Sequence, residues 1–281
     1  HNLRDLRSLE QQHASLRPFF SPVVLEAVAG QDPEQVLAPR QADVTVLFCD
    51  LRGFSRRAEQ DAGNLLGLLN RVSRALGVMT RYILEYGGVV GDFHGDSAMG
   101  FWGWPIAHSN SIEQVCRAAL AIRKEFAAAA QHEDNPLADF RVGIGLASGT
   151  AVAGRIGTVD QVKVTVFGPV VNLASRREKI PASVARVRRV ARVRPQGMDT
   201  PVEVSELLPP ESEWPQLSNE HLKAYESALD ALLDQQWETA FQWLHEVPAE
   251  DRVKDYLTVF IAQHHRVPPP NWDGVIPIDT K

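Results

Sequence analysis

The sequence predicts an α+β domain with the element order β-α-β-β-α-β, preceded by an N-terminal helix and followed by a C-terminal helical extension. Two observations support this prediction: short strands rich in β-branched residues beside glycine turns, and two long segments whose apolar residues recur at helical spacing. This order is the ferredoxin-like arrangement. We expect three parts: a helix and linker over residues 1–42, a central domain over residues 43–208, and a helical extension over residues 209–281.

The central domain is predicted element by element. β-branched residues mark its strands, apolar residues at helical spacing mark its helices, and Gly87-Gly88 ends the first helix. In chain order, the predicted elements are strand Val44–Cys49, helix Leu65–Ile83, strands Val89–Asp92 and Ser97–Trp102, helix Ile112–Phe126, strands Phe140–Ala147 and Val164–Phe167, and a closing strand Val202–Leu207.

The N-terminal part combines a helix with a proline-containing linker. Its apolar side recurs at 3-4-3 spacing, at Leu6, Leu9, His13 and Leu16. This spacing is typical of a short coiled coil, and equally of a helix packed on its own domain, so both interpretations stay open. A second helix is expected from Ser21-Pro22 through Ala29. Because the chain begins with His1, we expect an upstream sensor domain in the full-length protein.

The C-terminal extension is predicted to be helical over residues 218–265, where apolar residues again recur at helical spacing and Pro248 separates two segments. The first two helices resemble a tetratricopeptide-like pair. One partial repeat is too short for a solenoid, so we expect a capping or docking element. The proline-rich tail from Pro268 is predicted to be extended.

Composition narrows the possible functions. The chain has 281 residues, of which 44% are hydrophobic and 23% charged, as in an ordinary globular protein. Its net charge of −6 argues against nucleic-acid binding. No apolar run approaches the roughly 20 residues of a membrane span, so no membrane contact is expected from this fragment. The two cysteines, Cys49 and Cys116, make no disulfide framework and favour a cytoplasmic location.

Two aspartates each lie at the junction of a predicted strand and a glycine-containing turn. Asp50 follows Val44–Cys49 and precedes Gly53, and Asp96 follows Gly95 at the hairpin turn. Taken singly, such an aspartate is more often a turn residue than a metal ligand. As a pair, they predict a site for two Mg²⁺ or Mn²⁺ ions, because these hard cations prefer oxygen ligands.

The backbone after Asp50 is predicted to complete this site. The carbonyl of Leu51 is expected to join the metal shell. The amides of Arg52, Gly53 and Phe54 are expected to cradle phosphates as a backbone nest. A nucleoside triphosphate held through two cations is therefore the ligand that this stretch favours.

A third motif supplies an amide and a guanidinium. Asn172 and Arg176 lie four residues apart on an expected helix and share one face of it. In their order, spacing and residue types, the three motifs resemble those of the class III nucleotidyl cyclases. These enzymes make cyclic nucleotides from nucleoside triphosphates. The resemblance covers roughly residues 43–207. It implies that Asn172 orients the ribose, that Arg176 meets the α-phosphate, and that both come from the other subunit of a homodimer.

The resemblance implies conversion of ATP to 3′,5′-cyclic AMP and pyrophosphate by two-metal catalysis at a homodimer interface, with the N-terminal helix passing on an upstream signal. Two alternatives stay open. One is a guanylate or pyrimidine cyclase, and the other is a catalytically inactive regulatory domain that binds nucleotide.

Base recognition is where the chain departs from the family pattern. Adenylate cyclases commonly place a lysine four residues before the second metal aspartate, and here that position is Asp92. With Thr165, which matches the family, Asp92 would suit guanine. Lys163 precedes Thr165 by two residues and shares its strand face. Asp92 and Lys163 therefore form either a swapped pair that reads adenine or a plain cross-strand salt bridge.

A second departure lies near the end of the central domain. The family often has Lys-Gly before the last strand, with the lysine on the triphosphate, but this chain has Gln196-Gly197. Arg192 or Arg194 is expected to replace that lysine, or else the basic run Arg186–Arg194 is a solvated face. His94 is expected to be a surface or packing residue. Over residues 178–187 the chain is shorter than the family, which usually has a helix and a strand there.

Overall fold

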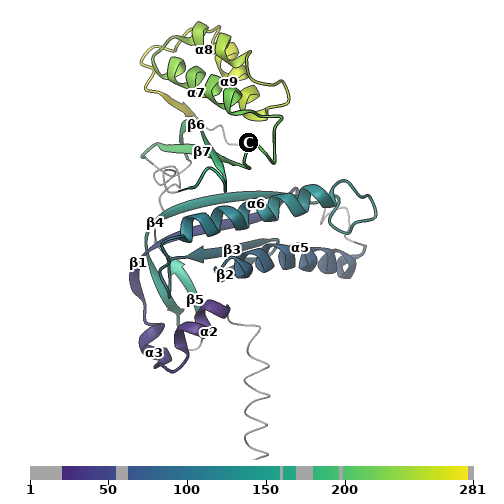
Figure 1. Cartoon of the computed structure of the whole chain (residues 1–281), viewed down its shortest axis with the longest axis vertical. Coiled ribbons are helices and arrows are strands. Elements are labelled where there is room, and N and C mark those ends of the chain that lie inside the picture. Colours follow the sequence, from purple (N-terminus) through teal and green to yellow (C-terminus); the bar gives the residue numbers. More distant parts are fainter. Residues whose placement is uncertain (1–20, 55–62, 159–160, 169–179, 196–198, 278–281) are drawn as a thin grey trace, which may run out of the picture. The chain divides into compact units, whose positions relative to one another are not determined.

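A computed structural model describes residues 21–54, 63–158, 161–168, 180–195 and 199–277 of the chain (Figure 1). The chain divides into two compact units, His1–Val171 and Asn172–Lys281. The predicted seam from Leu6 to Leu16 lies outside the described residues. None of the helices in the described ranges is long and apolar enough to span a membrane.

The first unit is built on a five-stranded sheet in which all neighbouring strands are antiparallel. Two long helices, α5 (Leu65–Glu85) and α6 (Ser111–Ala129), connect its strands. The chain order β1-α5-β2-β3-α6-β4 confirms the predicted ferredoxin-like α+β fold, with β5 added at one edge. The strands, in the sheet order β2-β3-β1-β4-β5, are β2 (Val89–His94), β3 (Ser97–Trp102), β1 (Arg40–Arg52), β4 (Arg141–Gly157) and β5 (Val162–Phe167).

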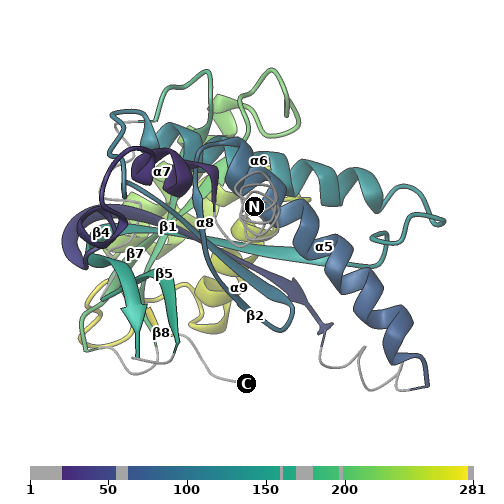
Figure 2. The same cartoon turned by 90° about the horizontal axis from the view of Figure 1, so that it is seen from below.

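The helices α5 and α6 lie side by side along one face of this sheet (Figures 1 and 2). Their apolar stripes face the strands, as the helical spacing predicts. Gly100 of β3 shows how close the approach is, because a Cβ there would lie 2.7 Å from the Ile83 side chain of α5. Leu47, the register partner of Gly100 on β1, is fully buried on the same face.

The opposite face of the sheet is only partly covered in the described part of the chain. The short helices α2 (Pro22–Val28) and α3 (Pro33–Val36) pack against Val44 and Val46 of β1. The first of these helices was expected, but α3 falls within the segment predicted to be a linker. Farther along β1, Phe48 is 51% exposed. The end of β1 that carries Asp50 is therefore open on this face.

The hairpin β2–β3 is positioned by the glycines that end α5. Gly87 adopts a φ of +75°, and the amide of Gly88 donates to the carbonyl of Ile83 at 2.8 Å. A Cβ on Gly88 would lie 2.6 Å from the Trp102 ring, so only glycine lets β2 begin this close to β3. The predicted helix stop is thus also the start of the hairpin that carries Asp96.

The second unit joins a small sheet to three helices. Its strands are β6 (Arg186–Arg194), β7 (Val202–Leu208) and β8 (Val275–Pro277), in the order β7-β6-β8. Its helices are α7 (Asn219–Leu233), α8 (Trp237–Leu244) and α9 (Arg252–Gln263), all within the range predicted to be helical. The tail that was expected to be extended supplies β8, which pairs in parallel with β6.

The strand Val202–Leu207, which was expected to close the central domain, lies in the second unit. As β7, it pairs with β6, and the hairpin buries Ala191, Val193 and Leu208 in one core with Tyr225 of α7 and Trp237 of α8. The alternating pattern of this strand would suit either sheet, and the apolar faces of the helices decide which one it joins.

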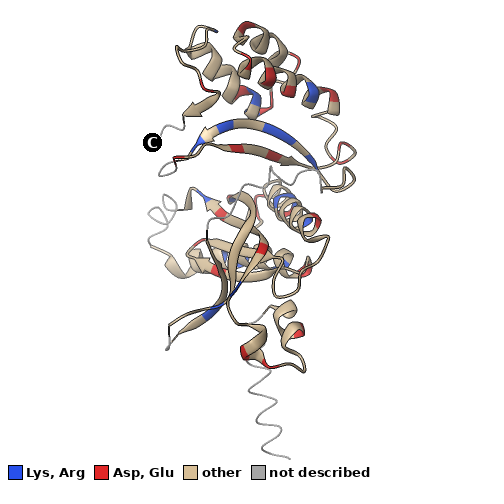
Figure 3. Cartoon of the chain, turned by 90° about the vertical axis from the view of Figure 1, so that its left-hand side faces the viewer, with Lys and Arg blue, Asp and Glu red and all other residues tan. Residues whose placement is uncertain are grey.

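The interpretation of Arg186–Arg194 as a solvated face is also wrong. Arg188 is 1% exposed and pairs with Glu206 of β7 and with Asp251, the N-cap of α9. Arg189 Nε donates to Glu226 of α7 at 2.5 Å. Figure 3 shows the basic residues along β6 and the acidic residues of β7 beside them. These carboxylates come from elements distant in sequence, so the run alone could not reveal them.

Candidate active site

The strand β1 and the hairpin β2–β3 bring the two predicted metal aspartates to the same end of the sheet. Asp50 is the register partner of Ser97 on β3, and Asp96 immediately precedes Ser97 in the turn. Gly95 adopts a φ of +59°, which lets the chain turn tightly there. The side chain of Asp50 is 44% exposed. Asp50 is thus held by a strand and Asp96 by the adjoining turn, and both are at least partly exposed to solvent.

The backbone beyond Asp50 is open on one side. The β1–β3 ladder ends at Asp50, whereas the β1–β4 ladder continues through Leu51 to Arg52. Gly53 then takes a φ of +76°, where the chain leaves the strand. Leu51 is buried, Arg52 is exposed and Phe54 is half-buried. The predicted Leu51 carbonyl ligand and the amides of residues 52–54 therefore lie in the segment that directly follows the carboxylate.

This end of the sheet suits hard divalent cations. The carboxylates of Asp50 and Asp96 are oxygen ligands, which Mg²⁺ and Mn²⁺ prefer. Within the described ranges, no group of three or more histidine, cysteine or acidic residues gathers into a metal cluster. Two carboxylates with a backbone carbonyl and the oxygens of a bound phosphate would match the sparse protein ligation that is usual for Mg²⁺.

The predicted base-reading residues meet across the sheet. Lys163 Nζ of β5 lies 2.5 Å from Asp92 Oδ2 of β2. These strands are the two edges of the five-stranded sheet, so the sheet must curl strongly for their side chains to touch. The hydrogen bond from Lys163, helped by the amide of Phe93, holds the pKa of Asp92 below its usual value, although partial burial opposes this.

Two neighbours complete this cluster. Thr165 is buried on β5, two residues beyond Lys163 on the same side of the strand. His94 Nε2 lies 3.1 Å from Asp92 Oδ2, so His94 has a partner that sequence reasoning did not identify. The signal was available: on a strand, residues 92 and 94 point to the same face.

The remaining predicted residues lie either outside the described ranges or in the second unit. Asn172, Arg176 and Gln196 lie outside the described residues. Arg192 and Arg194 are exposed on β6 of the second unit, where Arg194 Nη2 lies 3.6 Å from Asp273 Oδ2.

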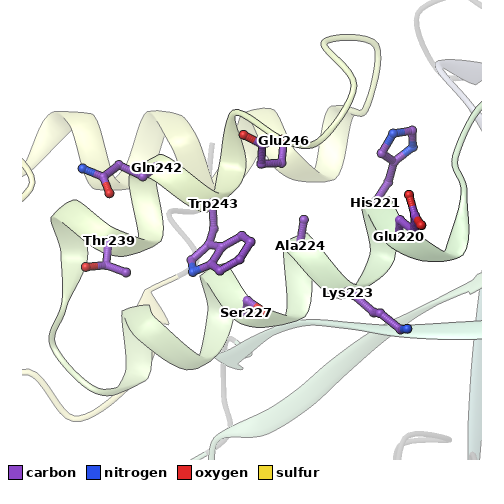
Figure 4. A pocket seen from close by; sticks show the side chains of 9 residues that line it. All are labelled: Glu220, His221, Lys223, Ala224, Ser227, Thr239, Gln242, Trp243 and Glu246. Atoms are coloured by element: carbon purple, nitrogen blue, oxygen red, sulfur yellow. The ribbon is translucent and has the colours of Figure 1, made fainter.

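The second unit has a groove of its own between α7 and α8 (Figure 4). Its volume is about 850 Å³, and the half-exposed ring of Trp243 lies near its middle. Sequence reasoning did not single it out, because its lining alternates with core positions along each helix. The lining residues are Glu220, His221, Lys223, Ala224, Ser227, Thr239, Gln242, Trp243 and Glu246.

The fold and the paired aspartates define a class of protein. The chain belongs to the family of the adenylate and guanylate cyclase catalytic domain, whose model matches residues 36–192. Adenylate cyclase 1 from Rhizobium meliloti (strain 1021) is 32% identical over 139 residues, which is 48% of this chain and 20% of that protein. An adenylate cyclase from Anabaena cylindrica is 28% identical over 171 residues, 58% of this chain and 33% of that protein. The chain thus spans a fifth to a third of these relatives.

Solved structures show the same fold. A bacterial light-regulated adenylyl cyclase aligns with a TM-score of 0.59 at 22% identity, over 72% of this chain and 62% of that one. The adenylyl cyclase CyaB from P. aeruginosa aligns at 0.51 and 24%, over 61% and 96% of the two chains. The guanylyl cyclase Cya2 aligns at 0.52 and 22%, over 63% and 96%. Because both substrate classes share this fold, the likeness does not decide which base is bound.

Proposed function

We propose that this cyclase domain converts ATP to 3′,5′-cyclic AMP and pyrophosphate at the interface of a homodimer. The single observation that carries the choice of ATP is the contact between Lys163 and Asp92. It places an ammonium group at the edge of the sheet where the family resemblance puts the base.

The part of the site where the phosphates would react is formed by the end of β1 and the turn between β2 and β3. Asp50, Asp96 and the carbonyl of Leu51 would hold two divalent cations, which when bound lower the pKa of the attacking ribose hydroxyl and neutralise charge on the phosphates. The amides of Arg52, Gly53 and Phe54 would donate to phosphate oxygens, and the positive φ of Gly53 helps to turn successive amides toward one ligand.

The partner subunit would supply the other half of the site. The ribose O3′ forms a bond to the α-phosphorus as the bond to the pyrophosphate oxygen breaks. Asn172 would orient the ribose for this attack. Arg176 would neutralise charge that builds on the α-phosphate oxygens, where a preorganised donor contributes most. Two chains are therefore needed for each site, which is our reason for proposing a homodimer.

The base is proposed to be adenine because of how Asp92 is already bonded. Its Oδ1 accepts from the amide of Phe93 at 2.9 Å, and its Oδ2 accepts from Lys163. An ammonium group has three donors, so Lys163 keeps two for an acceptor such as adenine N1. Guanine presents a donor at N1 instead, which cannot accept a hydrogen bond from Lys163.

The test is product identification. The purified chain, shown to be dimeric, would be incubated separately with ATP, GTP, CTP and UTP, with Mg²⁺ and with Mn²⁺, and any cyclic product would be identified by mass. Cyclic AMP alone supports the proposal. Cyclic GMP would instead mean that Asp92 reads guanine directly, and no product from any nucleotide would favour an inactive regulatory domain.

We also propose a cytoplasmic location and an upstream sensor domain. The nucleotide substrate is a cytoplasmic one, and Cys49 and Cys116 are both free and buried. The N-terminal segment, residues 1–42, would carry a signal to the catalytic domain by changing how the two subunits meet.

A further inference from the structure

The Asp50 carboxylate has a cationic neighbour within its own strand. Arg52 Nε lies 3.6 Å from Asp50 Oδ2. Residues two apart on a strand point to the same face, so the two side chains leave β1 together. The guanidinium of Arg52 therefore lies beside the carboxylate that the proposed function assigns to a divalent cation.

The neighbouring strand makes room for this pair at Gly143. Gly143 is the register partner of Asp50 on β4. A Cβ at this position would lie 2.3 Å from Arg52 Nε and 2.5 Å from Asp50 Oδ1. Its backbone is not left-handed, so the turn chemistry of glycine is not what the position requires. What it provides is space for a carboxylate and a guanidinium side by side.

A second arginine makes this orientation of Arg52 the favoured one. Arg141 is the register partner of Arg52 on β4 and is exposed. Like charges directly opposite each other on a sheet repel. Arg52 therefore lowers its electrostatic energy by lying toward Asp50 and away from Arg141.

We propose that Arg52 is a positioning residue that competes with the divalent cation for Asp50. This inference rests on the proposed function, since it takes Asp50 as a metal ligand. In the nucleotide-free protein, the guanidinium holds the carboxylate and weakens its hold on a cation. When a cation takes Asp50, the guanidinium is released toward the phosphate oxygens of a bound nucleoside triphosphate, which it binds well. Cation binding and nucleotide binding are thereby coupled through one side chain.

The first test measures Mn²⁺ binding without nucleotide, by electron paramagnetic resonance of the free ion. Arg52→Gln removes the charge and keeps much of the side chain's length. We expect it to bind Mn²⁺ more tightly, on the order of threefold, because an exposed ion pair of this kind contributes little more. Arg141→Gln is the matched control: it removes the same charge one strand away and is expected to change Mn²⁺ binding less. Equal or weaker Mn²⁺ binding by Arg52→Gln would overturn the inference.

The second measurement uses the complete enzyme. Arg52→Gln is expected to need less Mn²⁺ for half-maximal activity and to show a higher KM for ATP. A variant that was merely misfolded would lose both together, so the opposite directions are diagnostic. If the KM for ATP stays unchanged or falls, the proposal that the guanidinium of Arg52 moves to the phosphate oxygens is overturned.

Asp50→Asn distinguishes failure of this inference from failure of the proposed function. If the wild-type chain binds Mn²⁺ and Asp50→Asn does not, the metal assignment stands, and Arg52→Gln alone decides the inference. If neither protein binds Mn²⁺ without nucleotide, the inference is overturned, whereas the two-metal proposal is decided separately by whether cyclic nucleotide formation depends on Mn²⁺ and on Asp50.

Discussion

The half-exposed carboxylate of Asp50 is the clearest single-residue test of the chemistry. Asp50→Asn keeps the shape of the side chain and removes the charge that a cation needs. We expect cyclic nucleotide formation to fall by more than about 100-fold, because even residues that only support a metal ligand are worth 10- to 100-fold. The assay is product formation with Mn²⁺ and ATP. Circular dichroism should show an unchanged fold, and retained activity would remove Asp50 from the site.

Gly143 offers a second test, in which a substitution should lower activity without lowering stability. Gly143→Ala would place a Cβ within 2.6 Å of Arg52 Nη2 and 2.5 Å of Asp50 Oδ1. Both atoms end flexible side chains, so they can move aside and the melting temperature should change little. The moved carboxylate should lower kcat substantially, by about tenfold or more, since misplacing a reacting group by about an ångström is costly. Gly145→Ala is the matched control, because a Cβ there would meet nothing within 4 Å.

Lys163 tests the choice of base. Lys163→Met removes the ammonium donor and keeps an apolar stem of similar length. If Lys163 donates to adenine, kcat/KM for ATP should fall by about tenfold or more, the usual worth of a charged hydrogen bond, and the ratio of ATP to GTP turnover should fall with it. Steady-state kinetics with both nucleotides measures this. If the ratio of ATP to GTP turnover does not change, the contact between Lys163 and Asp92 is only a structural salt bridge.

Residue spacing together with the family resemblance predicted that Asp92 and Lys163 form a pair, but not which other residues surround them. Strand alternation says which residues share a face, which is why Lys163 and Thr165 were grouped correctly. The partners of Asp50 and Asp92 within their own strands, Arg52 and His94, were equally accessible to that rule and were missed. What spacing cannot supply is the curl that brings the sheet edges together, since curl depends on the whole sheet.

At the scale of elements, α5, α6 and the first four strands were predictable because each has a strong local signal. The strand Val202–Leu207 was expected in the central domain, but as β7 it pairs with β6 in the second unit. Its alternation of apolar and polar residues would fit either sheet. The position of β6 beside it is stabilised by ion pairs of Arg188 and Arg189, whose carboxylate partners lie up to 63 residues away in sequence. The short α3 was missed because a proline-containing stretch of four residues gives almost no periodic signal.

The Arg188–Asp251 pair makes a prediction about the stability of the second unit. Arg188 Nη2 donates to Asp251 Oδ1 at 3.1 Å, and both side chains are buried. Asp251→Asn at neutral pH should lower the free energy of unfolding by about 3 kcal/mol, because it removes one of the two counter-charges of a buried guanidinium and leaves only Glu206. Urea unfolding followed by tryptophan fluorescence reports on this unit, which contains four of the six tryptophans of the chain. A decrease in the free energy of unfolding of less than about 0.5 kcal/mol would contradict this prediction.

The same pair sets a pH dependence. Burial raises the pKa of Asp251, but the hydrogen bond and charge of Arg188 outweigh this and leave the pKa below its usual value of 3.8. A lowered carboxyl pKa contributes stability that is present above the unfolded value and is lost as the pH falls through the folded value. The stability difference between wild type and Asp251→Asn should therefore persist at pH 7 and shrink below about pH 4. A difference that grew on acidification would contradict this sign.

At the scale of the whole molecule, the shared site can be tested by complementation. Asp50→Ala and Asn172→Ala should each be inactive alone. In a mixed dimer, one site combines both defects and the other is intact, so an equimolar mixture should recover about a quarter of wild-type activity if subunits exchange freely. Mixing two preparations of Asp50→Ala is the control. If the mixture stays inactive while mass measurement shows mixed dimers, the site is not shared between chains.

The contact between β2 and β5 has a consequence for how the chain reaches its native state. Lys163 and Asp92 lie 71 residues apart in sequence, and three strands of the sheet lie between the strands that carry them. Contacts of such long separation are expected to form late, after the loop-closure entropy of the nearer pairings has been overcome. The ion pair would then affect the unfolding rate more than the folding rate. A nascent or partly folded chain could thus carry both aspartates in place and still be unable to distinguish one nucleotide base from another.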